Sequence, residues 1–337
     1  MVLLLAKDVH KKSTCFLRIH QSTSCSCSRF QILYSFIPLR RFPMKQRFSI
    51  LAIVLVFFCS LSVQAADTVK IGILAKNGPA KALKQWAATG EYLTAKLGKT
   101  VEIVPLDFDK VNPAIEANEV DFFLINSSMF ITAKVKYGAS AIATMINSRQ
   151  GQALKSFGGV IITTAYNVGI NSLADLKGKT FMAVKKSSFG GWQMAYKTIK
   201  DAELDPFTDF AKVDFAGKHD NVVFAIQNEQ AEAGTVRTDT LERMAASGAI
   251  AMEDFKIINK QSSDFPFVYS TTLYPEWPLA KTAATSDALA KEVVAALMPV
   301  TTEDPSASKA KIIGWTDPLD YGPVEDLQKA LGVGAYK

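Results

Sequence analysis

The stretch that decides the fold is residues 69–125, VKIGILAKNGPAKALKQWAATGEYLTAKLGKTVEIVPLDFDKVNPAIEANEVDFFLI. Apolar runs bounded by turn residues predict three strands, at 69–75, 101–106 and 120–125. The segments between them predict helices, at 80–97 and 111–117. Strands that alternate with helices in this way predict a parallel sheet with helices on both faces.

The alternation continues to the end of the chain. We expect further strands at 141–146, 157–164, 180–184, 212–215, 232–236, 255–259 and 267–273. We expect further helices at 128–137, 173–179, 190–202, 222–227, 240–247, 286–298 and 324–331. This part of the chain, about 270 residues, is too long for most single cores and fits two α/β lobes with parallel-dominated sheets.

The expected lobe boundaries follow from this pattern. The first lobe is predicted to hold residues 66–163 and 263–337, and the second to hold 164–262. Two extended crossings near 163 and 262 would then join the lobes and leave a cleft between them. Ligands of parallel α/β sheets bind beyond the carboxyl ends of the strands, so the cleft is the expected site.

An export signal is predicted upstream, and it begins at Met44. Lys45 and Arg47 precede an apolar run at 48–63, and a small-residue motif predicts cleavage after Ala65. This gives a signal peptide at 44–65 and a periplasmic location, without stable membrane insertion after cleavage. Residues 1–43 fit a wrongly chosen start codon or a disordered extension. A lipid anchor at Cys59 is disfavoured, because Phe58 is not small.

Composition changes once this leader is set aside. Residues 1–65 hold nine of the 38 Lys and Arg but one of the 32 acidic residues, so 66–337 carry a net charge of −2. That balance argues against nucleic acid as a partner. All four cysteines also lie within residues 1–65, and His219 is the one histidine that remains beyond them, so we expect no metal and no cofactor.

Two segments place small polar residues between a strand and a helix. Residues 184–192 (VKKSSFGGW) present Ser187, Ser188 and Gly190, and a similar turn presents Asn126, Ser127 and Ser128. Helix N-termini carry unpaired N–H groups and a partial positive charge, so both turns are candidate oxyanion sites. The alternative for both turns is that these residues only cap the helix that follows and bind no ligand.

Two further turns carry basic side chains. His219 lies at 217–221 (GKHDN), between the end of a strand and the start of a helix, with Asp220 as the helix cap. It is able to donate to an anion and to make binding depend on pH. Arg237 ends a strand and is suited to grip an oxyanion with two hydrogen bonds. A structural histidine, and a surface ion pair of Arg237 with Asp239 or Glu242, are the plainer alternatives.

Two loops also carry candidate residues. Asn77 begins a loop after the first strand that is placed to line the cleft from the opposite side. Residues 265–278 (FPFVYSTTLYPEWP) are rich in aromatic residues and proline, which core packing or a surface for a partner protein would explain. Enzyme motifs such as Gly-x-Ser-x-Gly are missing from the sequence, so the pattern does not favour catalysis.

These motifs, in this order, resemble the PhnD-like family of periplasmic phosphate, phosphite and phosphonate binders. The resemblance rests on 172–179 (SLADLKGK), the Ser187–Ser188–x–Gly190 turn and 218–222 (KHDNV), and it covers roughly residues 69–300. It implies a type II periplasmic binding fold, with Ser187, Ser188 and His219 on the anion.

Departures from the phosphonate binders point to one branch of the family. The first loop carries Asn77 where phosphonate binders present a tyrosine, and 234–244 and 273–278 resemble the periplasmic domains of tetrathionate-type sensor kinases. That resemblance implies a sulfur oxyanion or related anion, with Arg237 as its charge partner.

The expected function is therefore a non-enzymatic periplasmic trap for a small oxyanion that serves an inner-membrane ABC permease. The alternative is a ligand-sensing subunit for a separate membrane histidine kinase. An enzyme that acts on the anion and a cytoplasmic regulator with the same fold are less favoured.

Overall fold

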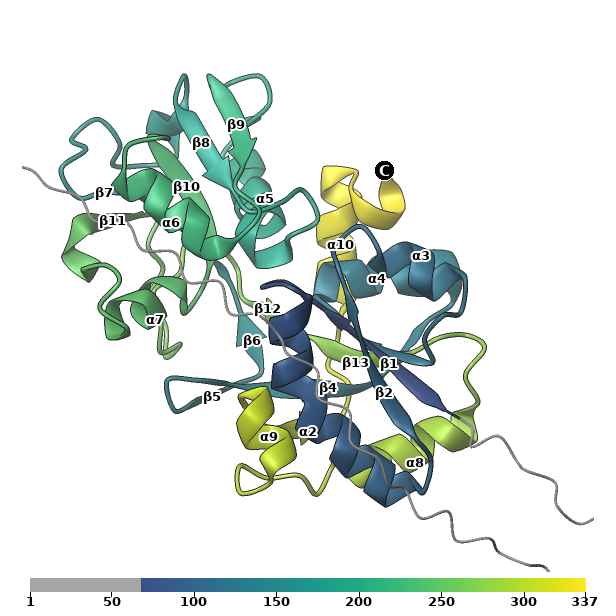
Figure 1. Cartoon of the computed structure of the whole chain (residues 1–337). Coiled ribbons are helices and arrows are strands. Elements are labelled where there is room, and N and C mark those ends of the chain that lie inside the picture. The colour runs from purple at the N-terminus through teal and green to yellow at the C-terminus, as the bar shows by residue number, and fades with distance from the viewer. Residues whose placement is uncertain (1–67) are drawn as a thin grey trace, which may run out of the picture. The chain divides into compact units, whose positions relative to one another are not determined.

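The computed structural model describes residues 68–337, which form two mixed sheets and one two-stranded pair (Figure 1). The predicted leader and the 1–43 extension lie outside the described residues. The larger sheet has seven strands in the order β14-β4-β13-β3-β1-β2, with β5 paired to β4. Its strands are β1 (Val69–Leu74), β2 (Val101–Leu106), β3 (Phe122–Leu124), β4 (Ser140–Arg149), β5 (Gln152–Leu154), β13 (Pro278–Lys281) and β14 (Ile312–Thr316).

The smaller sheet has five strands in the order β11-β7-β10-β8-β9. They are β7 (Gly159–Thr164), β8 (Thr180–Ala183), β9 (Lys212–Phe215), β10 (Ala233–Arg237) and β11 (Phe255–Ile258). The chain leaves the larger sheet after β5 and returns to it at β13. Near these two crossings, β6 (Ser156–Phe157) pairs with β12 (Tyr274–Pro275) in an antiparallel ribbon. The lobe boundaries at 163 and 262 stay a prediction.

The parallel β-α-β-α-β unit is confirmed, because β1 pairs in parallel with both β2 and β3. In the smaller sheet, β8 pairs in parallel with β9 and β10. The expectation of parallel-dominated sheets is wrong, since β4, β7, β11, β13 and β14 all run antiparallel to their neighbours. Of these, β7 and β13 follow crossings between the sheets, whereas β4, β11 and β14 each follow a helix but pair with a strand other than the one before that helix. The rule that a helix between consecutive strands makes them parallel neighbours therefore does not apply to them.

Helices connect the strands and cover the sheets (Figure 1). The α-helices are α2 (Pro79–Leu97), α3 (Val111–Glu116), α4 (Ser127–Tyr137), α5 (Met194–Asp201), α6 (His219–Gln227), α7 (Thr240–Ala246), α8 (Asp287–Leu297), α9 (Pro305–Ala310) and α10 (Gly322–Leu331). Shorter turns are η1 (Ala174–Leu176), η2 (Phe189–Gln193), η3 (Met252–Asp254) and η4 (Gly334–Tyr336). Of these, η2 is a single turn of π-helix directly before α5.

Some predicted elements differ from the structure. The strand expected at 267–273 is wrong, because the segment is irregular and its hydroxyl groups bond to β7 instead: Ser270 Oγ accepts from the Ile161 N–H and Thr271 Oγ1 from the Gly159 N–H, both at 2.9 Å. The elements α9, β5, β13 and β14 were not predicted, because short segments give weak periodicity.

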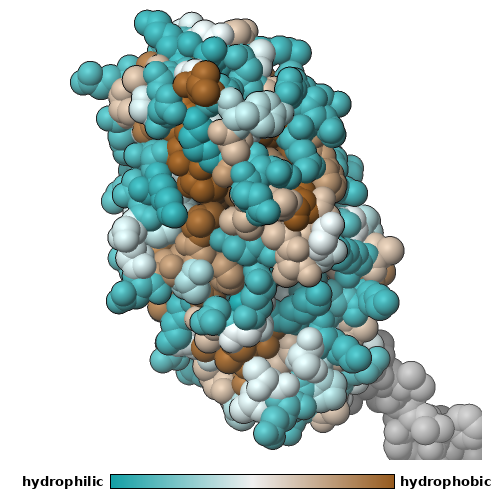
Figure 2. Space-filling model, turned by 90° about the vertical axis from the view of Figure 1, so that its left-hand side faces the viewer, coloured by the Kyte–Doolittle hydropathy of each residue, from teal (hydrophilic) through white to brown (hydrophobic). Residues whose placement is uncertain are grey.

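The core divides along the two sheets. One large apolar cluster lies around the seven-stranded sheet, and the five-stranded sheet has a cluster on each face. On the face in Figure 2, hydrophobic residues show mainly as narrow streaks between hydrophilic ones. Within residues 68–337 no helix is long and apolar enough to cross a membrane, and no cluster of His, Cys, Asp and Glu has the makings of a metal site.

Candidate functional site

Basic and hydroxyl side chains converge where the parallel strands of both sheets end. Lys76 follows β1, Asn126 follows β3, Ser188 follows β8, His219 begins the helix after β9, and Arg237 is the last residue of β10. Together they line one small cavity of about 20 Å³, here called the Arg237 cavity. Its walls are Leu74, Lys76, Phe108, Asn126, Phe157, Ser188, Phe189, Gly190, His219, Arg237 and Trp277.

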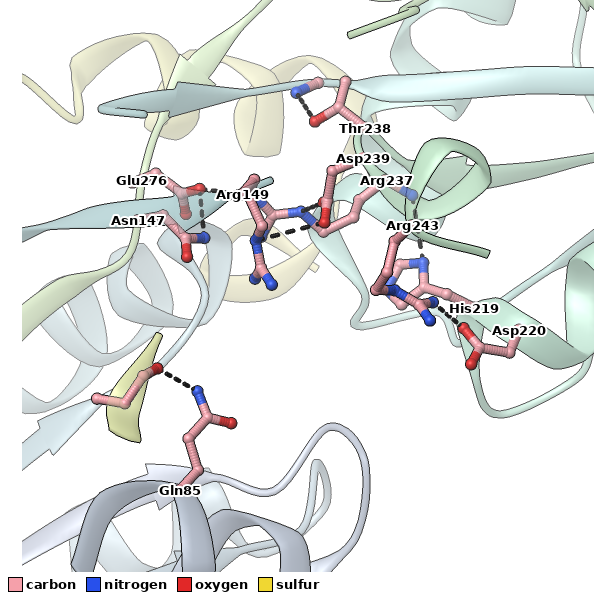
Figure 3. A network of polar contacts seen from close by, with 12 residues as sticks. Gln85, Asn147, Arg149, His219, Asp220, Arg237, Thr238, Asp239, Arg243 and Glu276 are labelled. Atoms are coloured by element: carbon pink, nitrogen blue, oxygen red, sulfur yellow. Dashed lines mark hydrogen bonds and ion pairs between the residues drawn. The ribbon is translucent and has the colours of Figure 1, made fainter. Parts of the chain in front are cut away.

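Arg237 is the centre of a buried polar network (Figure 3). Its Nη2 donates to Glu276 Oε1 at 2.6 Å, and its Nε lies 3.3 Å from Asp239 Oδ1. Glu276 also accepts from Asn147 Nδ2 at 2.9 Å and is fully buried. Burial lowers the pKa of Arg237, but the two carboxylates outweigh it, so the pKa lies above its usual value and the guanidinium stays charged.

His219 contacts this network through one ring nitrogen. The backbone N–H of Arg237 donates to His219 Nδ1 at 3.2 Å, so the ring proton belongs on Nε2, and the ring is a neutral donor to the cavity. Burial, then Lys76 and Arg237, lower its pKa well below the usual value. The expectation that His219 makes binding depend on pH is therefore not supported, because the ring stays neutral near neutral pH. Its expected cap, Asp220, pairs instead with Arg243.

The cavity offers hydrogen-bond donors that have no acceptor among the described residues. They are Arg237 Nη1 and the indole Nε1 of Trp277, on side chains that are 5% and 8% exposed. A buried N–H group without an acceptor is costly, and most such groups in proteins are paired. Both N–H groups, on residues in the wall of one cavity, are therefore available to an acceptor.

Aromatic faces support the cations of the cavity. Arg237 Cζ lies 4.2 Å from the centre of the Phe157 ring, and Lys76 Nζ lies 4.8 Å from that of Trp277. A cation over an aromatic face is stabilised there while its N–H groups remain free for other partners. Burial, then Arg149 and Arg237, lower the pKa of Lys76 well below its usual value. Mutual repulsion of this kind is what a bound anion would relieve.

The turn after β8 brings backbone close to Arg237. The Gln193 N–H donates to the Ser188 carbonyl at 3.1 Å, the i+5 bond that defines the π-turn η2. A Cβ added to Gly190 would lie 2.9 Å from both Arg237 Cβ and a Phe157 ring carbon, so glycine is needed for this approach. The predicted turn of two hydroxyl residues and two glycines after the strand is therefore a π-turn, and the α-helix expected from residue 190 begins at Met194.

Five of the predicted site residues line the Arg237 cavity: Asn126, Ser188, Gly190, His219 and Arg237. Asn126 is also the N-cap of α4, since its Oδ1 accepts from the Met129 N–H at 2.9 Å. Its Nδ2 donates to the Ser187 carbonyl at 3.2 Å and so bridges the ends of β3 and β8.

The other four predicted residues lie elsewhere. Ser127 is fully buried and donates to the Pro275 carbonyl at 2.6 Å. Ser187 and Ser128 line a larger groove of about 420 Å³ beside the C-terminal residues 331–334 and 337, where Gln328 Nε2 donates to Ser128 Oγ at 2.7 Å. Asn77 is exposed and lines a separate cavity of about 30 Å³ that also holds Arg149.

Sequence reasoning missed Lys76, Arg149, Glu276 and Trp277 as site residues. Glu276 and Trp277 lie in the aromatic and proline-rich segment 265–278, where an acidic residue between Pro275 and Trp277 was the available signal. Arg149 ends β4, an antiparallel strand, so a rule based on parallel strand ends does not find it.

The sequence profile of a family described as "ABC transporter, phosphonate, periplasmic substrate-binding protein" matches residues 71–320. The chain belongs to this family. It is a family of binding proteins without catalytic activity, so the chain is a solute-binding domain of the PhnD type.

One curated relative is the tetrathionate sensor histidine kinase TtrS of Salmonella typhimurium (strain LT2). It is 33% identical over 264 residues, which cover 78% of this chain and 43% of that protein. The chain thus spans less than half the length of this relative.

Two solved structures share the fold. A binding protein component of an ABC phosphonate transporter from Pseudomonas aeruginosa has a TM-score of 0.64 at 15% identity and covers 77% of this chain and 85% of its own. PhnD1 from Prochlorococcus marinus (MIT 9301), in complex with methylphosphonate, has a TM-score of 0.63 at 14% identity, with coverages of 79% and 99%. At these identities the similarity establishes the type II periplasmic-binding-protein fold alone.

Proposed function

We propose that this chain is a receptor for a small oxyanion, bound in the Arg237 cavity. The observation that carries the proposal is the pair of buried N–H groups, Arg237 Nη1 and Trp277 Nε1, that lack an acceptor among the described residues. An oxyanion supplies acceptors to both and neutralises the excess of positive charge around Lys76.

The remaining walls suit such a ligand. His219 Nε2–H and the Ser188 hydroxyl add donors from the five-stranded sheet, and Lys76 adds a charge from the seven-stranded one. The cavity wall includes no carboxylate. A wall of donors selects for anions and against cations and amines.

Ligand entry requires the cavity to widen. Its volume of about 20 Å³ holds about one water molecule, less than an anion with several oxygens occupies. The Asn126–Ser187 hydrogen bond joins the two sheets at this point, so it is the contact expected to loosen as the anion enters and to re-form around it. Binding would favour the conformation that supplies donors from both sheets.

The role we favour is sensing, with the occupied receptor read by a membrane histidine kinase. The support is the 33% identity to a tetrathionate sensor kinase, which also makes sulfur oxyanions such as tetrathionate and thiosulfate the leading ligand candidates. Delivery to an ABC permease is the second candidate, supported by the description of the family. Export through the signal at 44–65 would place the receptor in the periplasm for either role. Neighbouring genes for a kinase, or for a permease and ATPase, would distinguish the two.

A thermal-shift screen tests the ligand class. The purified chain is heated in HEPES with tetrathionate, thiosulfate, sulfate, phosphate or methylphosphonate. A true ligand at 100 times its Kd should stabilise the fold by about 2.7 kcal/mol, or roughly 5–10 °C in Tm. Potassium chloride at equal ionic strength is the control. If no oxyanion raises the Tm above this control, the chain is not an oxyanion receptor of this kind.

A further inference from the structure

A second cationic cavity adjoins the Arg237 cavity. It measures about 30 Å³ and is here called the Arg149 cavity; its walls are Leu74, Lys76, Asn77, Lys81, Ala82, Gln85, Trp86, Met145, Asn147, Arg149, Trp277 and Ala310. Three of these residues, Leu74, Lys76 and Trp277, also line the Arg237 cavity. The two cavities are therefore neighbours, separated by shared side chains.

The two cavities are built around a matched pair of arginines. Asp239 lies between them: its Oδ1 is 3.3 Å from Arg237 Nε, and its Oδ2 is 3.4 Å from Arg149 Nε. Figure 3 shows the terminal nitrogens of Arg149 directed away from Asp239, toward the gap on the side of Gln85. Arg149 Nε has no hydrogen-bond acceptor of good geometry in the part of the chain that the structure describes. Each arginine thus has donors available to its own cavity.

The charge of the combined site favours two anionic groups. Four cationic side chains line the two cavities, namely Lys76, Lys81, Arg149 and Arg237, and the walls include no carboxylate. Glu276 and Asp239 lie behind the walls and pair with the arginines. Arg149, Arg237 and the exposed Lys81 carry three positive charges against the two negative charges of Asp239 and Glu276, and Lys76 adds a fourth when a bound anion favours its protonated form. The occupied site then has a net charge of +2, which one singly charged anion does not balance.

We propose that the ligand is an elongated dianion with one anionic group at each end, and that Arg237 and Arg149 each bind one end. One end accepts hydrogen bonds from Arg237, His219 and Ser188. The other end accepts them from Arg149, with Asn77 and Gln85 in the same wall. The middle of the ligand lies beside Lys76 and Trp277, which line both cavities. This inference rests on the proposed oxyanion function and specifies the ligand of the same site.

Alkanedisulfonates test the proposal, because they carry two permanent charges at a chosen spacing. Calorimetric titration compares methanesulfonate with ethane-1,2-, propane-1,3- and butane-1,4-disulfonate. At one of these lengths, a disulfonate should bind about tenfold or more tightly than methanesulfonate, as a second charge-assisted contact implies. Equal affinity of methanesulfonate and every disulfonate would overturn the inference.

Variants assign the second end of the ligand. Arg149→Gln should lower the disulfonate-to-methanesulfonate affinity ratio toward one, whereas Arg237→Gln should weaken both ligands. Lys81→Gln is a second probe of the same end, on an exposed residue of α2, should Arg149→Gln fold poorly. Lys84→Gln, also exposed on α2 but in neither cavity, is the matched control and should leave both affinities unchanged. A ratio that neither Arg149→Gln nor Lys81→Gln alters would contradict the two-ended site.

The outcomes separate this inference from the proposed function. Single-ended oxyanions that bind well, without any gain for disulfonates, would leave the oxyanion receptor standing and remove the two-ended ligand. A chain that binds no oxyanion of either kind would remove both.

Discussion

At the scale of single residues, the site depends on cations kept close together in a buried place. Arg149 and Arg237 disfavour the charge on Lys76, and Arg237 disfavours the charge on Arg149. Asp239 and Glu276 offset only part of this repulsion at Lys76 and Arg149. The arrangement is stable in the fold because the guanidinium of Arg237 is paired with Glu276 and lies over Phe157. A bound anion would supply the missing negative charge.

Lys76 provides a test by pH. Its pKa is well below the usual value through burial and the neighbouring arginines, so a bound oxyanion should raise it. Binding should therefore take up a proton at pH values between the free and bound pKa, and affinity should fall as the pH rises through that window. Calorimetry in HEPES and in Tris measures the proton uptake from the difference in heat. Lys76→Arg should abolish it, because arginine does not deprotonate; uptake that persists in this variant would assign the proton elsewhere.

At the scale of elements, the turn after β8 positions the site through its glycines. The Val184 N–H at the end of β8 donates to the Gly191 carbonyl at 3.0 Å, so the π-turn η2 is fixed directly on the strand. A Cβ on Gly191 would lie 2.7 Å from Ser188 Oγ and 2.8 Å from Val184 Cβ. The turn that presents Ser188 to the cavity thus has no room for a side chain at this position.

Gly191→Ala should destabilise the protein by about 1–3 kcal/mol through overpacking, and should weaken anion binding by displacing Ser188. Chemical denaturation measures the first effect and calorimetry the second. Gly169→Ala is the control, because Gly169 is exposed and its nearest contact would be Asn167 Oδ1 at 3.4 Å. Unchanged stability of Gly191→Ala would show that the π-turn readily adjusts.

The same elements show what the sequence was able to predict. Apolar periodicity was sufficient for β1, β2 and α2, and strand-end turns led to Ser188, His219 and Arg237. Periodicity did not find β13 or β14, which are short and follow long excursions of the chain. Nor did it pair Arg237 with Glu276, because the contact joins residues 39 positions apart and depends on tertiary packing. For the same reason Ser127 and Ser128, plausible ligands by sequence, bond to Pro275 and Gln193 instead.

At the scale of the whole molecule, two sheets bring their parallel strand ends to one place. The five-stranded sheet contributes Ser188, His219 and Arg237, and the seven-stranded sheet contributes Lys76 and Asn126. Donors from both sheets converge, so an anion held by all of them would also hold the sheets together. That coupling is the physical basis on which a membrane partner would distinguish the occupied receptor from the empty one.

Calorimetric titration of wild type and Arg237→Ala with tetrathionate or thiosulfate, whichever gives the larger thermal shift, tests the central claim most directly. Loss of one charge-assisted contact should weaken binding by about 1.5–3 kcal/mol. Arg243→Ala, which removes an exposed arginine paired with Asp220, should bind as wild type does. Arg237→Ala leaves Glu276 buried without its cation, so circular dichroism is used to check that the variant is folded. If it is not folded, Arg237→Gln is measured in its place. A folded Arg237 variant with wild-type affinity would contradict the account.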